Sequence, residues 1–572
     1  MRDWRNTFCF VADDSDKNLH LNQANLLIGI ADTLHPGIHI NKLFSDAFTR
    51  VDVPGGKSFP EMNRKIEQQA KNGALIINYT GHGGLIGWAA EVILDVPTIR
   101  GLDNYDNLPL FITATCEFSR FDDPEFTSAG EYVFLNNHGG GIGLLTTTRL
   151  AYAHANIVVN LRIYQHMVKD ELGRMPRLGD LVRVSKIPSS HNYLNFVLLG
   201  DPALRLAYPK YDVITTQIND RSAQDNHDTI QALSVVTISG EIVDYKQEPV
   251  TTFNGYIYPK VYDKPTVYTT LGTDSESYPV DFELSDKVLY DGKVSVKDGE
   301  FTFSFMVPRD ISFKYDFGKI MYYALDTLNF VDAWGSYQEL LIGGIDESAE
   351  QDDQGPDINL YLDNRSFISG EKTSGRPLLI ADISDEHGVS FTGNSLGRDI
   401  TMHLDDDLVN SMVLNEYFDY HLNSYQSGTL EYQMETITQG WHTLELKAWD
   451  LQNNSTTEQI DFYIDDKAEI LLSGVVNYPN PFTNQTRFGF VHNKRGVTLS
   501  IEIRIYDLNG RYIGQINEKF PAYTDGIMPI FWNGRDANGN EVPAGIYSYN
   551  ITVSDDYGNK TTQHQKMIKM SD

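Results

Sequence analysis

The chain has 572 residues, which at roughly 150 residues per domain corresponds to about four domains. Its 46 basic and 78 acidic side chains give a formal net charge of −32, which argues against nucleic-acid binding because such a surface repels phosphates. Two cysteines exclude a disulfide framework and a cysteine-rich zinc site, whereas 41% hydrophobic residues are ample for folded cores.

Residues 8–206 alternate short apolar runs with stretches of helical periodicity. The expected strands lie at 8–12, near 38, and at 74–78, 110–115 and 141–146, and the expected helices at 22–34, 59–72, 151–169 and 176–186. This alternation indicates a mostly parallel sheet that is covered on both faces and carries its chemistry at the carboxyl ends of the strands. We therefore expect an α/β domain over residues 1–208.

After about residue 208 the helical periodicity fades, and alternating strands recur with turn signals. This pattern predicts three all-β domains: a β-sandwich over 209–346, an immunoglobulin-like domain over 347–468 and a C-terminal domain over 469–572. An acidic, apolar-poor linker over 346–356 separates the first two. A layout of this kind is typical of exported proteins, although the middle domains are equally compatible with a stalk or spacer.

The first twenty residues lack the charged-then-apolar pattern of a signal peptide. No window holds about 18 consecutive apolar residues, the length that a membrane-spanning helix needs. Because the later domains are typical of exported proteins, we expect that Met1 begins a fragment and that an N-terminal region is missing.

The segment NYTGHGG gives the sharpest chemical signal, because it places His82 directly after an apolar strand. The next core strand ends at Cys116, so two neighbouring parallel strands would bring both side chains to one sheet edge. An imidazole there can accept the thiol proton, hold the thiolate and later protonate a leaving amine. The amides of Gly83 and Cys116 would form an oxyanion hole. In the structural alternative, His82 is an ordinary loop residue and Cys116 a small core filler.

Four segments, INYTGHGGLIGW, LPLFITATCEFSRF, GGGIGLLTTTR and NFVLLGDPALRL, occur in this order. Together they resemble the catalytic domain of the gingipain family of cysteine peptidases, and the resemblance covers about residues 1–208. It implies an α/β caspase-like fold with Cys116 as nucleophile, His82 as general base, and the Gly83 and Cys116 amides as oxyanion hole. We expect no cofactor and no metal.

The same resemblance implies an acidic residue that orients the imidazole, and Asp13 and Asp14 stand at the matching strand end. Both aspartates are equally suited to cap the helix that begins after them. Four further residues are expected to border the substrate pocket: Trp88, Thr147, Thr148 and Arg149. A cation at position 149 departs from a pocket that selects basic side chains, so gingipain-like specificity is not assigned.

The segments YPNPF, IRIYDLNG, WNGRDANG and VPAGIY near the C-terminus are similar to the C-terminal sorting domain of proteins exported by the type IX secretion system of Bacteroidetes. Physically they predict a small sandwich with a Pro-Asn-Pro entry turn and tight Asn-Gly hairpins. The alternative is one more immunoglobulin-like spacer.

A gingipain-like domain followed by β domains and this tail resembles the sortases of the type IX secretion system. The resemblance implies that Cys116 cleaves sorting domains from cargo proteins and passes the cargo, as a thioester, to an amine of surface lipopolysaccharide. The implied partners are secreted cargo, the lipopolysaccharide acceptor, the outer-membrane shuttle PorV and attachment-complex subunits, and the implied location is the cell surface or outer membrane. The alternatives are a secreted gingipain-like endopeptidase that is itself cargo, and a non-catalytic surface adhesin.

Overall fold

The computed structural model describes residues 3–571 except 54–55, 92, 225–228, 274–276, 394–396, 406–409, 466–469, 471, 495–496 and 523–525. The chain divides into two compact units, Met1–Ala349 with Leu422–Ser424, and Glu350–His421 with Tyr425–Asp572. The break near residue 350 falls in the acidic linker. The division into four domains stays a prediction, and its boundary at 468/469 lies outside the described residues.

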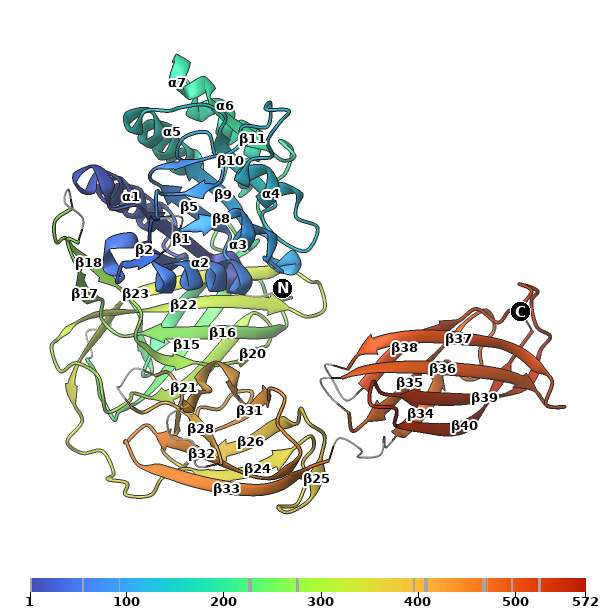
Figure 1. Ribbon diagram of the computed structural model, residues 1–572. Helices are drawn as coiled ribbons and strands as arrows, with labels where there is room; N and C mark the ends of the chain where they lie inside the picture. The colour runs from blue at the N-terminus through green and yellow to red at the C-terminus, as the bar shows by residue number, and fades with distance from the viewer. Residues whose placement is uncertain are drawn as a thin grey trace. The chain divides into compact units, whose positions relative to one another are not determined.

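The first unit opens with a six-stranded sheet in the order β11-β10-β9-β5-β1-β2 (Figure 1). All neighbours in it pair in parallel except β10 and β11, which are antiparallel. Its strands are β1 (Thr7–Ala12), β2 (His39–Phe44), β5 (Ile76–Thr80), β9 (Leu110–Ala114), β10 (Gly143–Thr147) and β11 (Phe196–Leu199). The sheet edge formed by the carboxyl ends of the parallel strands is therefore the expected location of chemistry.

Helices cover both faces of this sheet, because its strands are apolar on both sides. Along β1 the side chains alternate: Phe8, Phe10 and Ala12 join one core, whereas Cys9 and Val11 join the other. The first core is covered by α1 (Ser15–Leu34), α5 (Ala153–His166) and α6 (Leu178–Ser185), and the second by α2 (Pro60–Asn72), α3 (Val96–Arg100) and α4 (Ala129–Leu135). The predicted α/β caspase-like fold class is confirmed.

The rest of the first unit is a β-sandwich whose two antiparallel halves, β19-β16-β22-β23 and β12-β15-β21, join through a short parallel pairing of β12 with β23. The halves pack face to face, since Tyr290 stacks on Phe303 with ring centroids 5.4 Å apart. The strands are β12 (Tyr211–Ile218), β15 (Val235–Val243), β16 (Gly255–Tyr262), β19 (Val288–Asp291), β21 (Glu300–Met306), β22 (Asp316–Asp326) and β23 (Asp332–Ile345). A separate hairpin pairs β17 (Thr266–Thr269) with β18 (Asp281–Leu284).

Side chains of the α/β domain bind this sandwich directly. Arg5 Nη1 donates a hydrogen bond of 2.6 Å to Asp332 Oδ2. Asp46 accepts hydrogen bonds from the amides of Gly272 and Thr273, at 2.6 and 3.0 Å. The two domains are therefore one compact unit, and the sandwich is more than a spacer behind the sheet.

The second unit contains two all-β modules. In the first, one sheet holds β24 (Asp357–Leu362), β26 (Leu378–Ser384), β30 (Phe418–Tyr420) and β31 (Ser427–Gln433), and the other holds β28 (Thr401–Leu404), β32 (Gly440–Asp450) and β33 (Ser455–Ile464). In the second, β34 (Leu472–Tyr478), β35 (Thr486–His492) and β38 (Gly526–Trp532) face β36 (Thr498–Asp507), β37 (Tyr512–Pro521), β39 (Gly545–Ser554) and β40 (Lys560–Lys569) around one core. Sandwiches of this kind confirm the predicted all-β class.

The Pro-Asn-Pro turn of the last module rests on its final strand. Asn480 Oδ1 accepts a hydrogen bond of 2.9 Å from the Ile568 amide, and the Phe482 amide donates to the Ile568 carbonyl at 3.0 Å. The predicted hairpins are also present: Gly510 and Gly539 both adopt positive φ angles, as tight Asn-Gly turns require. These motifs are therefore structural parts of the module.

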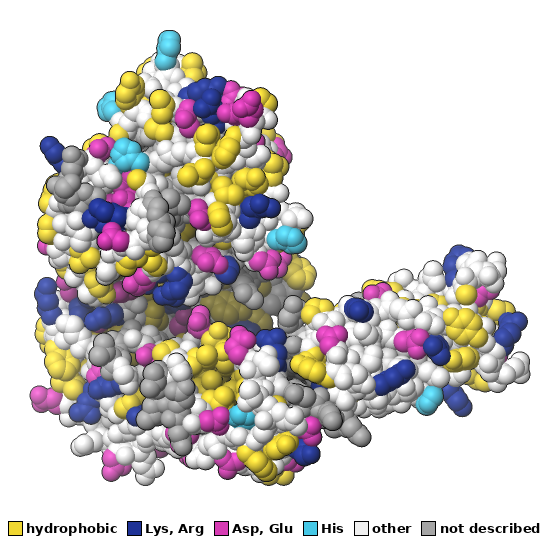
Figure 2. All heavy atoms as spheres, viewed as in Figure 1, with side chains coloured by type: hydrophobic (Ala, Val, Ile, Leu, Met, Phe, Trp, Pro, Cys, Tyr) yellow, Lys and Arg dark blue, Asp and Glu magenta, His cyan; other side chains and the backbone are white. Residues whose placement is uncertain are grey.

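On the face shown in Figure 2, lysine and arginine side chains are scattered rather than gathered into one patch. On this face the distribution agrees with the net charge of −32, because it offers no basic patch to a polyanion. Among the described residues, none of the helices combines the length and the apolar character that crossing a bilayer requires.

Candidate active site

Two neighbouring parallel strands, β5 and β9, carry His82 and Cys116 at the same sheet edge. Their register sets Thr80 opposite Ala114, and the Gly81 amide extends the ladder by one bond, to the Ala114 carbonyl at 3.5 Å. His82 follows Thr80 by two residues, and Cys116 follows Ala114 by two residues. The imidazole and the thiol therefore leave the sheet at matching positions of strands whose backbones run about 4.8 Å apart.

The main chain of His82 is fixed on both sides. Its amide donates a hydrogen bond of 3.0 Å to Asp13 Oδ2. Its carbonyl accepts one from the Tyr79 hydroxyl at 2.5 Å and one from the Ala89 amide at 2.8 Å. Asp13 therefore holds the backbone of His82, whereas the resemblance had assigned it to the ring.

The glycines on either side of His82 are required by close approaches. A Cβ at Gly81 would lie 2.4 Å from the Tyr79 hydroxyl, and a Cβ at Gly83 would lie 2.5 Å from Thr115 Oγ1. The second approach shows that the loop after His82 lies against the residue that precedes Cys116. The Gly-His-Gly motif is thus needed to bring the two candidate catalytic segments together.

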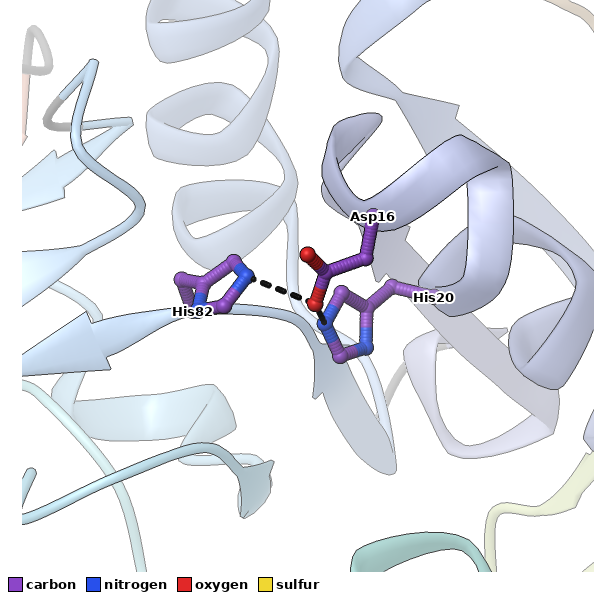
Figure 3. A group of neighbouring side chains, drawn as sticks. All are labelled: Asp16, His20 and His82. Carbon is purple, nitrogen blue, oxygen red and sulfur yellow. Dashed lines mark hydrogen bonds and ion pairs between the residues drawn. The ribbon is translucent and has the colours of Figure 1, made fainter. Parts of the chain in front are cut away.

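The carboxylate beside the His82 ring belongs to Asp16. His82 Nε2 lies 3.1 Å from Asp16 Oδ2, and both side chains are about half exposed (Figure 3). A second imidazole, that of His20, approaches the same oxygen with its Nε2 at 3.7 Å, and the two rings meet edge to face with centroids 5.1 Å apart. Burial lowers the pKa of His20. The carboxylate beside the imidazole therefore lies two to three positions further along the chain than Asp14 and Asp13, the two expected residues.

The prediction that Asp14 orients the ring is wrong in this structure. Its side chain is buried, and its Oδ1 accepts a hydrogen bond of 3.0 Å from Ser45 Oγ. Burial and the neighbouring Asp13 carboxylate raise the pKa of Asp14 to about 7. Asp14 also makes no side-chain capping bond to α1, so the alternative of a helix cap does not hold for it either.

Asp16 reaches His82 because α1 begins with an unusual turn. Asp16, Lys17 and Asn18 have φ angles of 57°, 57° and 58°, in the left-handed region, before the regular helix starts. Non-glycine residues there cost about 1 kcal/mol or more each, so surrounding contacts must hold the turn. Asn18 supplies them: its Nδ2 donates to the Tyr278 carbonyl at 2.6 Å, and its Oδ1 accepts from the Tyr278 amide at 3.3 Å.

Cys116 lies at a sharp turn after β9. The next residue, Glu117, has a φ of 49°, and its amide donates to the Arg149 carbonyl at 3.4 Å. The thiol is half-buried and donates to the Ala151 carbonyl at 3.4 Å. Within the described residues no hydrogen bond joins this thiol to the His82 imidazole, and the Cys116 amide has no hydrogen-bond acceptor. The two groups share an edge without touching, as catalytic pairs without substrate often do.

The Gly83 amide is free of its own hairpin. β6 (Gly83–Gly84) pairs with β7 (Gly87–Trp88), and Gly83 lies opposite Trp88. The next hydrogen bond of this hairpin runs from the Ala89 amide to the His82 carbonyl, one residue outside that pair on each strand. That arrangement is the non-hydrogen-bonded type of antiparallel pair, so the Gly83 N–H is directed away from β7. It is geometrically available as an oxyanion donor.

Two of the residues predicted to border the substrate pocket are buried instead. Trp88 is 0% exposed and stacks on Tyr79, with centroids 4.4 Å apart and planes 7° from parallel. Because the Tyr79 hydroxyl binds the His82 carbonyl, Trp88 stabilises the loop of His82 by holding the Tyr79 ring in place. Thr147 is also 0% exposed, and its hydroxyl donates to the Thr115 carbonyl at 2.6 Å. Both predictions are corrected: these side chains support the site from inside the fold.

The other two predicted border residues lie nearer the surface. Thr148 is half-buried, and its amide and hydroxyl both donate to the Asn195 carbonyl. Arg149 is exposed and forms a two-pronged pair with Asp122, one bond of which measures 2.8 Å. This pairing lowers the pKa of Asp122 to about 2. A role for Thr148 and Arg149 at the pocket stays a prediction.

Residues 1–207 match the model of peptidase family C25. This part of the chain is therefore similar to the peptidases of family C25. C25 is a family of cysteine peptidases, so the gingipain-like resemblance of the sequence is confirmed for this part of the chain. The roles of Cys116 and His82 stay predictions.

The chain is also similar to several solved structures. Dimeric latent PorU from Porphyromonas gingivalis is 28% identical over 72% of this chain and 39% of that chain, with a TM-score of 0.35. The Arg-specific cysteine proteinase gingipain R is 13% identical over 59% of this chain and 67% of that one, with a TM-score of 0.30. The complex of the pro- and mature domains of RgpB, also from Porphyromonas gingivalis, is 14% identical over 59% of this chain and 69% of that one, with a TM-score of 0.29. The chain thus spans 39% of the PorU chain. No curated protein matches it.

Sequence reasoning missed Asp16, His20, Asn18 and Tyr79. Asp16 and His20 are four residues apart, a spacing that brings side chains together on a regular helix, but the backbone at residues 16–18 is left-handed here. This left-handed turn carried no signal in the sequence, because it depends on contacts with Tyr278, some 260 residues away.

Proposed function

We propose that this chain is a cysteine endopeptidase in which Cys116 is the nucleophile and His82 the general base, with Asp16 as a positioning residue. The observation that carries the proposal is the register of β5 and β9, which places both groups two residues beyond one matched pair. The C25 assignment of residues 1–207 supports the same reaction class.

The first half of the reaction begins when substrate binding draws the thiol away from the Ala151 carbonyl toward the imidazole. His82 accepts the thiol proton, and the Cys116 sulfur attacks the peptide carbonyl carbon. The amides of Gly83 and Cys116 stabilise the resulting oxyanion. The C–N bond then breaks as His82 returns the proton to the leaving amine, and the acyl group remains on Cys116 as a thioester.

The second half resolves the thioester, and here the chain is proposed to act as a sortase of the type IX secretion system. An amine of surface lipopolysaccharide attacks the thioester, loses a proton to His82 and forms a new amide bond, while the thiol is regenerated. Water competes by the same route, so the amine must be held close to the thioester to win. The C-terminal module, with its turn and hairpin motifs, supports a place in this secretion system, because it resembles the domain that directs such export.

In this proposal the substrates are secreted cargo proteins that carry C-terminal sorting domains, and the bond broken precedes that domain. The protein works at the cell surface or outer membrane, with the lipopolysaccharide acceptor, the shuttle PorV and attachment-complex subunits as partners. The similarity to PorU, which covers 72% of this chain and 39% of the PorU chain, favours this assignment.

The deciding experiment incubates the full chain with a model cargo that carries a sorting domain, with and without an amine donor, and analyses the products by mass spectrometry. We expect cleavage before the sorting domain and, with the donor present, a cargo fragment heavier than the hydrolysis product by the mass of the donor minus one water. Cys116→Ala and His82→Ala should abolish both, whereas Cys9→Ala, the matched control, should not. Cleavage by the Cys116→Ala chain at the normal rate rejects the peptidase assignment. If the donor is present and the cleaved cargo still carries only a free carboxylate from hydrolysis, the sortase step is rejected.

The C-terminal module also favours a second candidate, a secreted endopeptidase that is itself cargo, because a sorting domain on this chain would direct its own export. The state of the mature surface protein separates the two. A protein that keeps residues 469–572 supports the sortase, and one that has lost them supports the cargo role.

A further inference from the structure

We propose that Asp16, His20 and His82 together bind a divalent cation of the zinc type. This ion inhibits the peptidase because the imidazole of His82 coordinates it and can no longer act as a base. The binding part stands on the geometry alone. The inhibition rests on the proposed function, because it requires His82 to be the general base.

The three side chains already surround one point. Asp16 Oδ2 lies 3.1 Å from His82 Nε2 and 3.7 Å from His20 Nε2, and the three candidate ligand atoms lie within 4.8 Å of one another. Zinc bonds of about 2.0–2.1 Å in tetrahedral geometry separate neighbouring ligand atoms by about 3.3 Å. The two measured separations bracket that value, so small side-chain rotations suffice to bind an ion. Figure 3 shows both rings turned toward the carboxylate.

His20 provides an independent sign of a ligand. It is only 3% exposed, yet among the described residues neither of its ring nitrogens has a hydrogen-bond partner. Buried polar atoms in native proteins are nearly always hydrogen-bonded, and the 3.7 Å approach of His20 Nε2 to Asp16 Oδ2 is too long for a hydrogen bond, so this imidazole is ready for a ligand. One turn along the same helix, Gln23 Oε1 is also buried without a hydrogen-bond partner, and in the proposed site it accepts the second ring N–H of a metal-bound His20.

The donor set selects the class of ion. Two imidazoles and one carboxylate suit zinc and neighbouring transition metals, whereas calcium and magnesium prefer oxygen ligands throughout. Three protein ligands leave a fourth position for water. The proposed site departs from the expectation of no metal that was drawn from the sequence.

The consequence for catalysis follows from the lone pairs of the imidazole. A neutral imidazole has one nitrogen that carries a proton and one that is free to accept. When the free pair of Nε2 binds a metal, the proton is on Nδ1, and the ring has no acceptor left for the thiol proton. His82 is then unable to act as a base, and the thiol stays in its unreactive form.

The binding test uses the full chain in a Cys116→Ala/His387→Ala background. The first change removes a competing thiol, and the second disables a group of Asp352, Asp385 and His387 that also brings possible ligands together. Calorimetric titration with zinc chloride in excess calcium and magnesium should show one site of micromolar affinity. His20→Ala and Asp16→Asn should each weaken it by at least about tenfold.

Asp16→Asn is the safer of these variants, because asparagine tolerates the left-handed backbone at position 16. His35→Ala is the matched control, since His35 is also buried, with an unpaired Nε2, but lies outside the cluster. Its zinc affinity should equal that of the parent. Unchanged zinc binding in His20→Ala and Asp16→Asn, or equal weakening in His35→Ala, overturns the site.

The inhibition is tested on chains that retain Cys116, with the model cargo as substrate. Zinc above its dissociation constant should stop cleavage by the parent, and a chelator should restore it. The same zinc concentration should leave the His20→Ala chain at its own zinc-free rate. Equal inhibition of both chains, or no inhibition of a parent that binds zinc, rejects inhibition through His82. Absence of cleavage by the zinc-free parent rejects the proposed function and the inhibition with it, while the titration still decides the site.

Discussion

Asn18 and Tyr278 form a two-point clamp between the α/β domain and the sandwich that follows it. The Asn18 amide side chain donates to the Tyr278 carbonyl at 2.6 Å and accepts from the Tyr278 amide at 3.3 Å. Asn18 ends the left-handed turn that presents Asp16 to His82. A loop of the second domain therefore holds the carboxylate that orients the candidate catalytic base.

Replacing Asn18 should lower activity without touching the reacting groups. Asn18→Ala loses two hydrogen bonds worth about 1 kcal/mol each and places alanine at a φ that costs about 1–2 kcal/mol. We expect about a tenfold loss of kcat, with KM little changed. Asn18→Gly loses the same bonds but tolerates the backbone, so it separates the two causes. Full kcat in both variants would show that the clamp does not position Asp16.

The two cysteines should differ sharply in reactivity. Burial raises the pKa of Cys9 to about 12, so it carries almost no thiolate at neutral pH, whereas Cys116 is half-buried at the sheet edge. Iodoacetamide at pH 7.5 should add one group to the native chain and two to the chain in guanidinium. Intact-protein mass spectrometry reads both. A single adduct that persists in Cys116→Ala would contradict the assignment.

Arg149 is expected to disfavour basic side chains next to the scissile bond. Its carbonyl binds the Glu117 amide, one residue beyond Cys116, so the backbone of Arg149 lies against the nucleophile loop. Arg149→Ala should raise kcat/KM for peptides with Lys or Arg before the cut several-fold over neutral peptides, and more at low salt. Arg149→Ala also leaves the Asp122 carboxylate unpaired, and this negative charge can itself attract basic peptides. The double variant Arg149→Ala/Asp122→Asn is the control, because it removes both charges. If neither variant changes the selectivity between basic and neutral peptides, Arg149 lies outside the pocket.

The contribution of Asp385 to the stability of the second unit should become more favourable as acid neutralises its side chain. Burial, with the Asp450 and Asp352 carboxylates as further causes, raises the pKa of Asp385 to about 6, whereas the unfolded value is about 3.9. The folded state therefore binds more protons in this range. The contribution of Asp385 is most favourable below pH 4 and is lost as the pH rises through 6.

Asp385→Asn removes the charge but keeps an acceptor for the His387 and Gly388 amides, both of which bind Oδ1. Allowing for solvent screening of this partly exposed group, we expect a gain of about 1 kcal/mol at pH 7.5, or roughly 2–4 °C in Tm. The gain should vanish near pH 4. Calorimetric scans at both pH values test this, and a lower Tm at pH 7.5 would contradict it.

The sheet and the two strand ends were predictable because their signals are local. Apolar runs of strand length alternate with helical periodicity, and the register that matches His82 with Cys116 follows once β5 and β9 are neighbours. Trp88 was misplaced for the opposite reason. An aromatic residue after a catalytic loop has the same sequence signature whether it faces a substrate or, as here, stacks on Tyr79 inside the core.

Asp16 could not be chosen over Asp13 and Asp14 from the sequence. Three aspartates follow β1 within four residues, and any of them can face the ring depending on the path of the backbone. The left-handed turn decides among them, and it is held by Asn18 and a distant loop rather than by local preference. Long-range contacts of this kind lie outside what periodicity and turn propensities encode.

The clamp by Tyr278 also bears on where the protein can be cut without losing its chemistry. A fragment that stops at residue 208 would retain the whole six-stranded sheet and both reactive side chains, yet it would lack Tyr278 and the amides that bind Asp46. It would also lose Phe282 and Trp334, which pack into the core of the α/β domain, so the minimal working peptidase reaches through the sandwich to the end of β23.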